Sequence, residues 1–160
     1  VRPDLVTLVP ETREGLGAER GLDVEDRRGE IARIIEMLKS AGIPLSVLVE
    51  AAPGQVKAAQ RAGTAAVQLH TGRFCWADNP AARATELDRL VNAAKLAHKL
   101  GLTVHAGGGL GPETLGEIAP IAEIGAVHVG HAFIARALLV GISEAVRHLL
   151  RILSRTGGQA

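Results

Sequence analysis

Hydrophobic and polar positions follow two patterns along this chain. Short runs of almost uninterrupted apolar residues, such as "IPLSVLVE" at residues 43–50, predict strands that are buried in a sheet. Longer stretches lie between these runs, and in them apolar residues recur every three or four positions, as at Ile31, Ile34, Ile35 and Leu38. That spacing predicts helices with one apolar face. The two patterns alternate from the first residues to the last.

The alternation predicts a parallel α/β fold. Strands are expected over residues 4–10, 43–50, 64–70, 102–106 and 125–130, and helices over residues 24–42, 53–63, 81–101, 112–118, 131–137 and 141–155. A glycine stands at or just past the end of three of these helices, at Gly42, Gly63 and Gly101, as is common at helix C-termini. Each connection is long enough to cross over to a parallel neighbour.

Two architectures satisfy this order of elements. One is a five-stranded doubly wound domain, for which 160 residues is a comfortable length. The other is part of an eight-stranded (β/α)8 barrel, which typically needs about 250 residues. No linker or change of composition divides the chain, so a single domain over residues 1–160 is expected in either case.

Composition and charge narrow the class of partner. Hydrophobic residues make up 47% of the chain, which indicates a globular protein. Lys and Arg total 18 against 17 Asp and Glu, and this balance argues against nucleic acid or an anionic membrane as a general partner. No run approaches the roughly 20 apolar residues of a membrane span. The single cysteine, Cys75, excludes an internal disulfide and fits a reducing, cytoplasmic setting.

Glycines follow the last two predicted strands. "HAGGG" places Gly107, Gly108 and Gly109 after the fourth strand, and "VGHA" places Gly130 and His131 after the fifth. In both architectures, ligands gather where the carboxyl ends of the strands meet. Bare backbone N–H groups beside a helix N-terminus bind phosphate well. These glycines therefore predict one cup for a phosphoryl group, with an ordinary tight turn as the alternative for the triple glycine.

Several other polar residues are expected at the same ends of the strands. Glu50 ends the second strand, and His70, His105 and His131 lie at or near strand ends, where an imidazole can act as acid, base or hydrogen-bond donor. His128 lies inside the fifth strand and is interpreted as a packed residue. No HExxH spacing and no Cys/His cluster occurs in the sequence, so no metal site is expected. A nucleophilic Cys75 is the weaker interpretation of the loop over residues 71–80.

Four blocks of sequence, taken in order, resemble a known enzyme family. "LVPETR", "ERGLDV", "HTG" and "VGHAFIARAL" follow one another between about residues 4 and 153. Together they resemble pyridoxine 5'-phosphate synthase, the last enzyme of the deoxyxylulose-dependent vitamin B6 pathway. The resemblance implies a (β/α)8 barrel of which the five strands here are strands four to eight. The absence of an initial Met agrees with the expectation that this is the C-terminal part of a longer protein.

The resemblance also implies an activity. The family condenses 1-deoxy-D-xylulose 5-phosphate with 3-amino-1-hydroxyacetone 1-phosphate and releases phosphate and water. It uses no metal and no organic cofactor, so none is expected here. The expected partners are thus small phosphorylated substrates, together with further copies of the chain in a homo-oligomer.

Some site residues match the family and carry its roles by resemblance. Gly109, Gly130 and His131 match positions that hold the substrate phosphate through backbone groups, and Gly107 and Gly108 complete that loop. Three further residues match blocks of the substrate site, namely Glu11 and Arg13 in "VPETR" and Thr71 in "HTG".

Other positions depart from the family. Gln68 stands where the family has a glutamate, Gly108 where it has a catalytic histidine, and Gly17 where it has a threonine. The principal catalytic carboxylate belongs to units that the resemblance places before residue 1. Catalytic residues are therefore unassigned, with His70 and His105 as possible contributors. Two alternatives stay open: a non-catalytic phosphate-binding relative of the family, and a complete five-stranded binding module whose resemblance is incidental.

Overall fold

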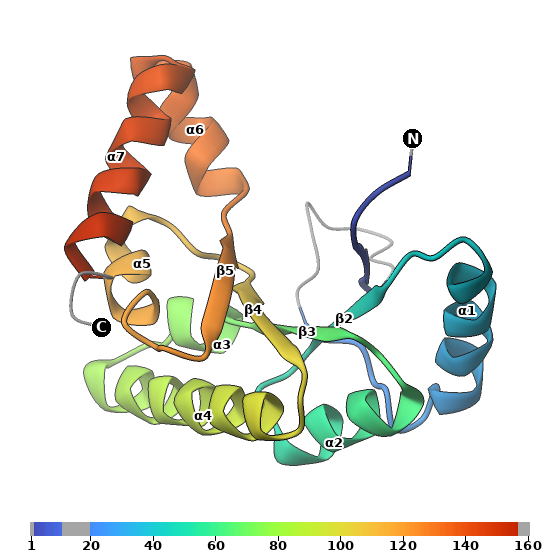
Figure 1. Ribbon diagram of the computed structural model, residues 1–160. Helices are drawn as coiled ribbons and strands as arrows, with labels where there is room; N and C mark the ends of the chain where they lie inside the picture. Colours follow the sequence, from blue (N-terminus) through green and yellow to red (C-terminus); the bar gives the residue numbers. More distant parts are fainter. Residues whose placement is uncertain (1, 11–19, 157–160) are drawn as a thin grey trace.

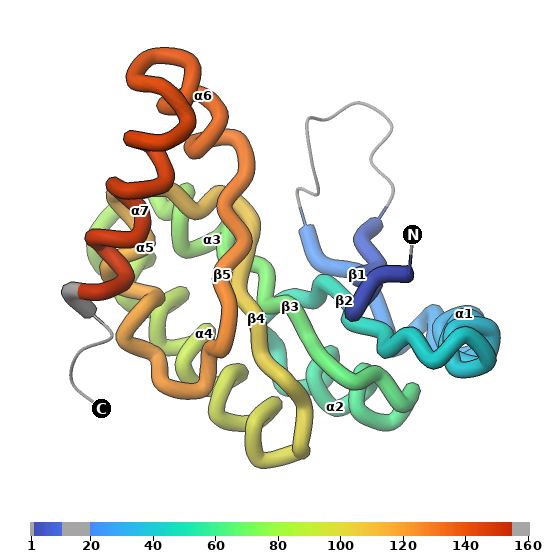
Figure 2. The backbone as a smooth tube through the Cα atoms, turned by 45° about the horizontal axis from the view of Figure 1, so that its top comes forward, coloured from blue at the N-terminus to red at the C-terminus, as the bar shows by residue number. Residues whose placement is uncertain are grey.

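Five parallel strands form one sheet in the order of the sequence. The computed structural model describes residues 2–10 and 20–156. The strands are β1 (Val6–Leu8), β2 (Leu45–Val49), β3 (Ala66–His70), β4 (Thr103–Gly107) and β5 (Ile124–His128), and they pair as β1-β2-β3-β4-β5. Each strand thus lies beside the strands that precede and follow it along the chain, as Figure 2 shows.

This strand order decides between the two architectures. A doubly wound sheet needs a point where the strand order reverses, so that helices cover both faces. Here the order never reverses, and right-handed crossovers then place the successive helices on one side of the sheet. Figure 1 shows α1, α2, α4 and α7 following one another around the outside of the strands. The sheet is therefore an open arc of a barrel, and the doubly wound alternative is wrong.

The helices begin and end close to the predicted residues. They are α1 (Arg28–Ser40), α2 (Pro53–Ala62), α3 (Gly72–Cys75), α4 (Pro80–Lys99), α5 (Pro112–Ile118), α6 (His131–Val140) and α7 (Ile142–Thr156). Local chemistry explains two of these ends: Asn79 caps α4 by accepting a hydrogen bond from the Ala82 N–H at 2.9 Å, and Gly63 ends α2 with φ 87°. The short α3 was not predicted, because four residues carry no periodicity.

The two faces of the sheet differ in character. Val47, Val67 and Val104 lie side by side in register, are buried, and pack with the small side chains of α2 and α4. Because side chains alternate along a strand, the neighbouring row Leu48, Gln68 and His105 points to the opposite, inner face. That inner face carries polar groups, whereas near-continuous apolar strands had predicted burial on both sides.

Helices α6 and α7 form a hairpin that extends beyond the sheet (Figure 1). Several of their large apolar side chains are exposed, among them Ile134, Leu138, Leu139, Ile142 and Leu150. No helix in the described part of the chain is long and apolar enough to cross a membrane.

Candidate functional site

The glycine turns after β4 and β5 lie next to each other at the carboxyl edge of the sheet. Gly107, the last residue of β4, pairs in register with His128, the last residue of β5. A Cβ added at Gly107 would lie 2.9 Å from Cβ of His128, and one added at Gly111 would lie 3.1 Å from Cβ of Ala132 in α6. The structure therefore brings the two predicted phosphate-binding segments to one edge, side by side.

Backbone conformation and close packing both require glycine at two positions of this loop, Gly108 and Gly109. Gly108 has φ +107° and Gly109 has φ +76°, values that residues with a Cβ rarely adopt. A Cβ at Gly108 would lie 2.6 Å from Cδ2 and 2.7 Å from Nε2 of His70. A Cβ at Gly109 would lie 2.9 Å from Cζ2 of Trp76. The loop thus lies directly on the His70 and Trp76 rings, and no side chain fits between.

Thr71 ties the end of β3 to this loop. Its backbone N–H donates to the carbonyl of Gly107 at 2.9 Å, and its hydroxyl donates to the carbonyl of Gly108 at 2.5 Å. Both partners are more than 30 residues away in the sequence, and the Thr71 side chain is fully buried. Thr71 therefore fixes the position of the glycine loop. Its hydroxyl proton is used in the bond to Gly108 and is not donated to a ligand.

Glu50 organises the neighbouring part of the edge. Its Oε1 accepts a hydrogen bond from the Gly21 N–H at 2.8 Å and lies 3.7 Å from Nδ1 of His70. Its Oε2 lies 3.2 Å from Nε of Arg73. The His70 side chain is 1% exposed, so the imidazole supports the loop from below rather than facing solvent. The place of Glu50 at the end of β2 predicted that it lies at this edge, but no local pattern predicts the three segments that it joins.

His105 and His128 form a pair on the inner face of the sheet. Nδ1 of His105 lies 3.2 Å from Nε2 of His128, and the ring centroids are 5.2 Å apart. Partial burial lowers the pKa of both imidazoles, and the neighbouring His128 lowers that of His105 further. His128 is exposed, so its interpretation as a packed residue is wrong: at the last position of β5 its side chain points to the inner face.

The remaining candidate residues lie outside the part of the chain that the structure describes, on the inner face of the sheet, or in the short α3 that follows β3. Glu11 and Arg13, with Gly17, lie outside the described residues. Gln68 lies beside His105 in register on the inner face. Burial raises the pKa of the Cys75 thiol, which disfavours the thiolate that a nucleophile needs. Within residues 2–10 and 20–156, no three His, Cys, Asp or Glu side chains are grouped to hold a metal ion.

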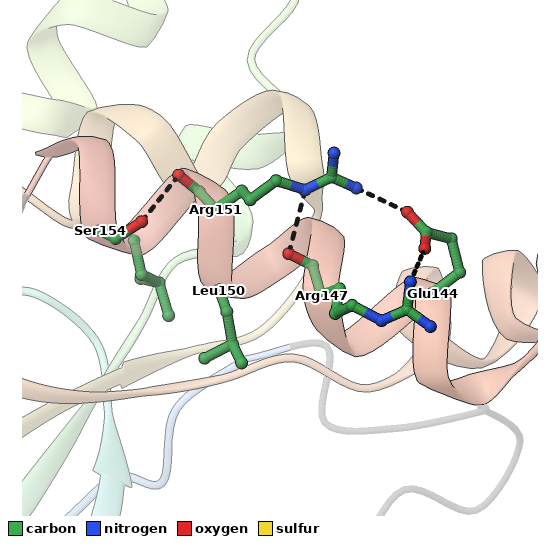
Figure 3. A pocket seen from close by; sticks show the side chains of 6 residues that line it. Glu144, Arg147, Leu150, Arg151 and Ser154 are labelled. Carbon is green, nitrogen blue, oxygen red and sulfur yellow. Dashed lines mark hydrogen bonds and ion pairs between the residues drawn. The ribbon is translucent and has the colours of Figure 1, made fainter.

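A second polar cluster lies on α7, away from the strand ends. Glu144 accepts hydrogen bonds from Arg147 at 2.5 Å and from Arg151 at 2.6 Å, drawn as dashed lines in Figure 3. All residues that line this hollow belong to α7 itself, and both arginine side chains are about two-thirds exposed (66% and 65%). Ion pairs of this kind stabilise a helix surface weakly, so the carboxyl edge of the sheet remains the candidate site.

Comparison with known proteins identifies the family to which this chain is similar. The family model described as "Pyridoxal phosphate biosynthesis protein PdxJ" matches residues 1–155. Proteins named pyridoxine 5'-phosphate synthase from Chloroherpeton thalassium and Syntrophotalea carbinolica are each 47% identical over 152 residues. These alignments cover 95% and 93% of this chain but only 64% and 62% of the relatives. The chain thus spans less than two thirds of their length.

A solved structure shows the same fold at a lower sequence identity. A chain in the crystal structure of the Amycolatopsis orientalis BexX/CysO complex matches with a TM-score of 0.50 and 20% sequence identity. The match covers 83% of this chain and 52% of that chain. At this identity the likeness concerns the fold alone.

Proposed function

The chain belongs to the pyridoxal phosphate biosynthesis PdxJ family, and from this membership we propose that the protein acts as a pyridoxine 5'-phosphate synthase. The reaction joins 1-deoxy-D-xylulose 5-phosphate to 3-amino-1-hydroxyacetone 1-phosphate, with loss of phosphate and water. Its substrates are small and anionic, and its setting is the cytoplasm. The placement of two glycine turns side by side at the ends of β4 and β5 is the observation that carries the proposal.

These turns supply donors for a phosphate group. The first-turn N–H groups of α6, beginning at His131, have no acceptor inside the helix and carry its positive dipole end. The N–H of Gly109 donates no hydrogen bond to any described residue. A phosphate between the two turns would accept from both sets of amides, as anions do at other helix N-termini. Gly107 and Gly108 let the first turn lie against His128 and His70, where a Cβ would collide, and a Cβ at Gly130 would meet no atom within 4 Å.

Holding a phosphate fixes the rest of a small substrate over the inner face of the sheet. That face presents Gln68, His105 and His128 next to the proposed cup. Anchoring by a group that does not react lowers the entropy cost of bringing two substrates together, and such positioning is a large part of catalysis. Within this proposal Thr71 contributes by holding the loop, because its hydroxyl donates to Gly108. The roles of Glu11 and Arg13 toward the substrate stay predictions.

A comparison of two variants tests the phosphate cup. His131 is the first residue of α6, where proline is tolerated. His131→Pro removes one amide donor, whereas His131→Ala removes the imidazole and keeps the amide. We expect His131→Pro to weaken binding of 1-deoxy-D-xylulose 5-phosphate about tenfold or more relative to His131→Ala, by analogy with other charge-assisted hydrogen bonds.

Calorimetry on the protein expressed from its complete gene measures this difference, and release of inorganic phosphate measures turnover. Gly116→Ala in α5 is the matched control, since a Cβ there meets no atom within 4 Å. Equal affinities for the Pro and Ala variants would contradict the cup. Absence of phosphate release from the unmodified protein with both substrates would contradict the synthase activity.

Self-association is part of the same proposal. The exposed apolar side chains of α6 and α7, such as Leu138 at 83% and Leu139 at 85% exposure, support it, because contiguous apolar patches commonly mark interfaces. Sedimentation of the unmodified protein beside a Leu138→Glu, Leu139→Glu variant tests it: the variant should sediment as a smaller species.

A further inference from the structure

The contact between His105 and His128 fixes where one proton lies. Their facing atoms, Nδ1 of His105 and Nε2 of His128, are 3.2 Å apart, which is hydrogen-bond distance. One proton lies between the two facing nitrogens. Two N–H groups facing each other would repel, and two unprotonated nitrogens facing each other would repel through their lone pairs. The outer atoms, Nε2 of His105 and Nδ1 of His128, then carry one further proton between them in the neutral pair. A neutral pair of this kind can take up a proton at one end and release one at the other.

The pair extends from the edge of the sheet toward its centre. His128 ends β5 beside Gly107, whereas His105 is the third residue of β4 and lies beside Gln68 of β3. The pair therefore begins next to the proposed phosphate cup and continues two residues deeper along the inner face. A substrate anchored in the cup would lie over both rings.

The surroundings keep the pair neutral at physiological pH. On the inner face of the described strands, the neighbours of the pair are Gln68 and Ala126, which do not titrate, and His70, which is buried under the glycine loop. Partial burial lowers the pKa of both rings. Neutral imidazoles are the form that can serve as a base first and as an acid afterwards.

We propose that His105 and His128 form a proton relay that performs acid–base work in this site, where Gln68 and Gly108 offer no titrating group. The inference rests on the proposed function for its substrate. In one direction, Nδ1 of His128 accepts a proton from the substrate, and the shared proton shifts from Nε2 of His128 to Nδ1 of His105. Nε2 of His105 then donates its proton to the hydroxyl group that leaves as water. One proton moves from one substrate atom to another, and the pair returns to neutrality with its tautomers reversed.

The relay is tested first without turnover. Nitrogen-15 NMR of the histidine rings, recorded on the protein from its complete gene across pH 5 to 8, reports which nitrogen carries each proton. We expect the two rings to titrate as a coupled unit, and His128→Gln to change the titration of His105. His98, which is exposed on α4, provides the matched control variant His98→Gln, and this change should move neither ring. Independent titration of the two rings would overturn the relay.

Kinetics test the relay's role. His105→Gln, His128→Gln and the double variant should each lower kcat by about 10²–10⁴-fold, the range for a lost general acid or base. Because the two residues act as one unit, the double variant should be no slower than the slower single variant. Substrate affinity should stay within about threefold of the unmodified protein, since the phosphate cup is intact.

The two possible failures are distinguishable. An unmodified protein that neither binds nor turns over the substrates contradicts the proposed function, and the NMR titration still decides whether the proton is shared. An active unmodified protein whose Gln variants match His98→Gln in rate overturns the relay while leaving the proposed function in place.

Discussion

The hydroxyl of Thr71 donates a 2.5 Å hydrogen bond to the carbonyl of Gly108, joining the end of β3 to the loop after β4. Thr71 is fully buried, and its backbone N–H also bonds to this loop, at the carbonyl of Gly107. The three glycines could adopt many conformations in isolation, so this pair of bonds selects one of them. The shape of the proposed cup therefore depends on a residue in another strand.

Thr71→Val tests this dependence. The substitution keeps the shape of the side chain but leaves the Gly108 carbonyl without its partner, which should cost about 1–3 kcal/mol of unfolding free energy. Thr71→Ser keeps the hydroxyl and loses one methyl group, worth about 0.8 kcal/mol. Urea denaturation compares the two variants. A valine variant as stable as the serine variant would show that the bond does not hold the loop.

Gly108→Ala is expected to destabilise the protein by about 1–3 kcal/mol, the usual cost of an unfavourable backbone conformation. The reason is the φ of +107° together with the 2.6 Å approach of an added Cβ to the His70 ring. Gly116→Ala is the control, and in the middle of α5 it should stabilise by about 0.5–1 kcal/mol. Thermal unfolding measures both changes.

The same geometry predicts that Gly108→His, although it introduces the residue expected from the family, fails to fit unless the loop moves.

Substitutions at Glu50 and Arg73 distinguish the stability contributed by a hydrogen bond from that contributed by an ion pair. Glu50→Ala leaves the Gly21 N–H without its 2.8 Å acceptor and should cost about 1–3 kcal/mol. Arg73→Ala removes only an ion pair whose arginine is 67% exposed, so its effect should stay below about 1 kcal/mol. Denaturant titration of the two variants measures the difference. Equal losses would place the stabilisation in the ion pair instead.

The His105–His128 pair makes stability depend on pH. Burial lowers the pKa of both rings below the ordinary histidine value of 6.5, so the unfolded chain binds more protons than the folded one as pH falls through that value. Stability contributed by the neutral pair is therefore complete above about pH 6.5 and is progressively lost below it.

Comparing the unmodified protein with the His105→Gln, His128→Gln variant isolates this effect from other groups. The difference in unfolding free energy between the two should shrink between pH 8 and pH 5. A constant difference over that range would show that the rings bind protons equally well in the folded and unfolded chain.

Much of the local structure follows from the chain itself. The periodicity near Ile31 and Ile35 predicted α1, and Pro53 with Gly63 marked both ends of α2, because these signals act over a few residues. The glycines after β4 and β5 marked the edge where a ligand would bind, since parallel strands place all their carboxyl ends together.

The arrangement across the sheet was not predictable in the same way. Periodicity is identical in a doubly wound sheet and in a barrel, and only the pairing order β1-β2-β3-β4-β5 distinguishes them. The face of the sheet on which His128 lies was not predictable for a related reason. Whether a strand residue faces the helices or the inner face depends on register with the neighbouring strand, and β4 and β5 have an irregularity between Val104 and His105 that shifts this register.

Apart from the short α3, residue types and their spacing within short windows were sufficient to predict the elements, the parallel direction of the strands and the family. Tertiary structure alone decided which distant groups meet: Thr71 with Gly108, Glu50 with Gly21, and His105 with His128. Those contacts join residues 23 to 37 positions apart, and their geometry is set by how strands pack side by side. No pattern within one segment contains that information.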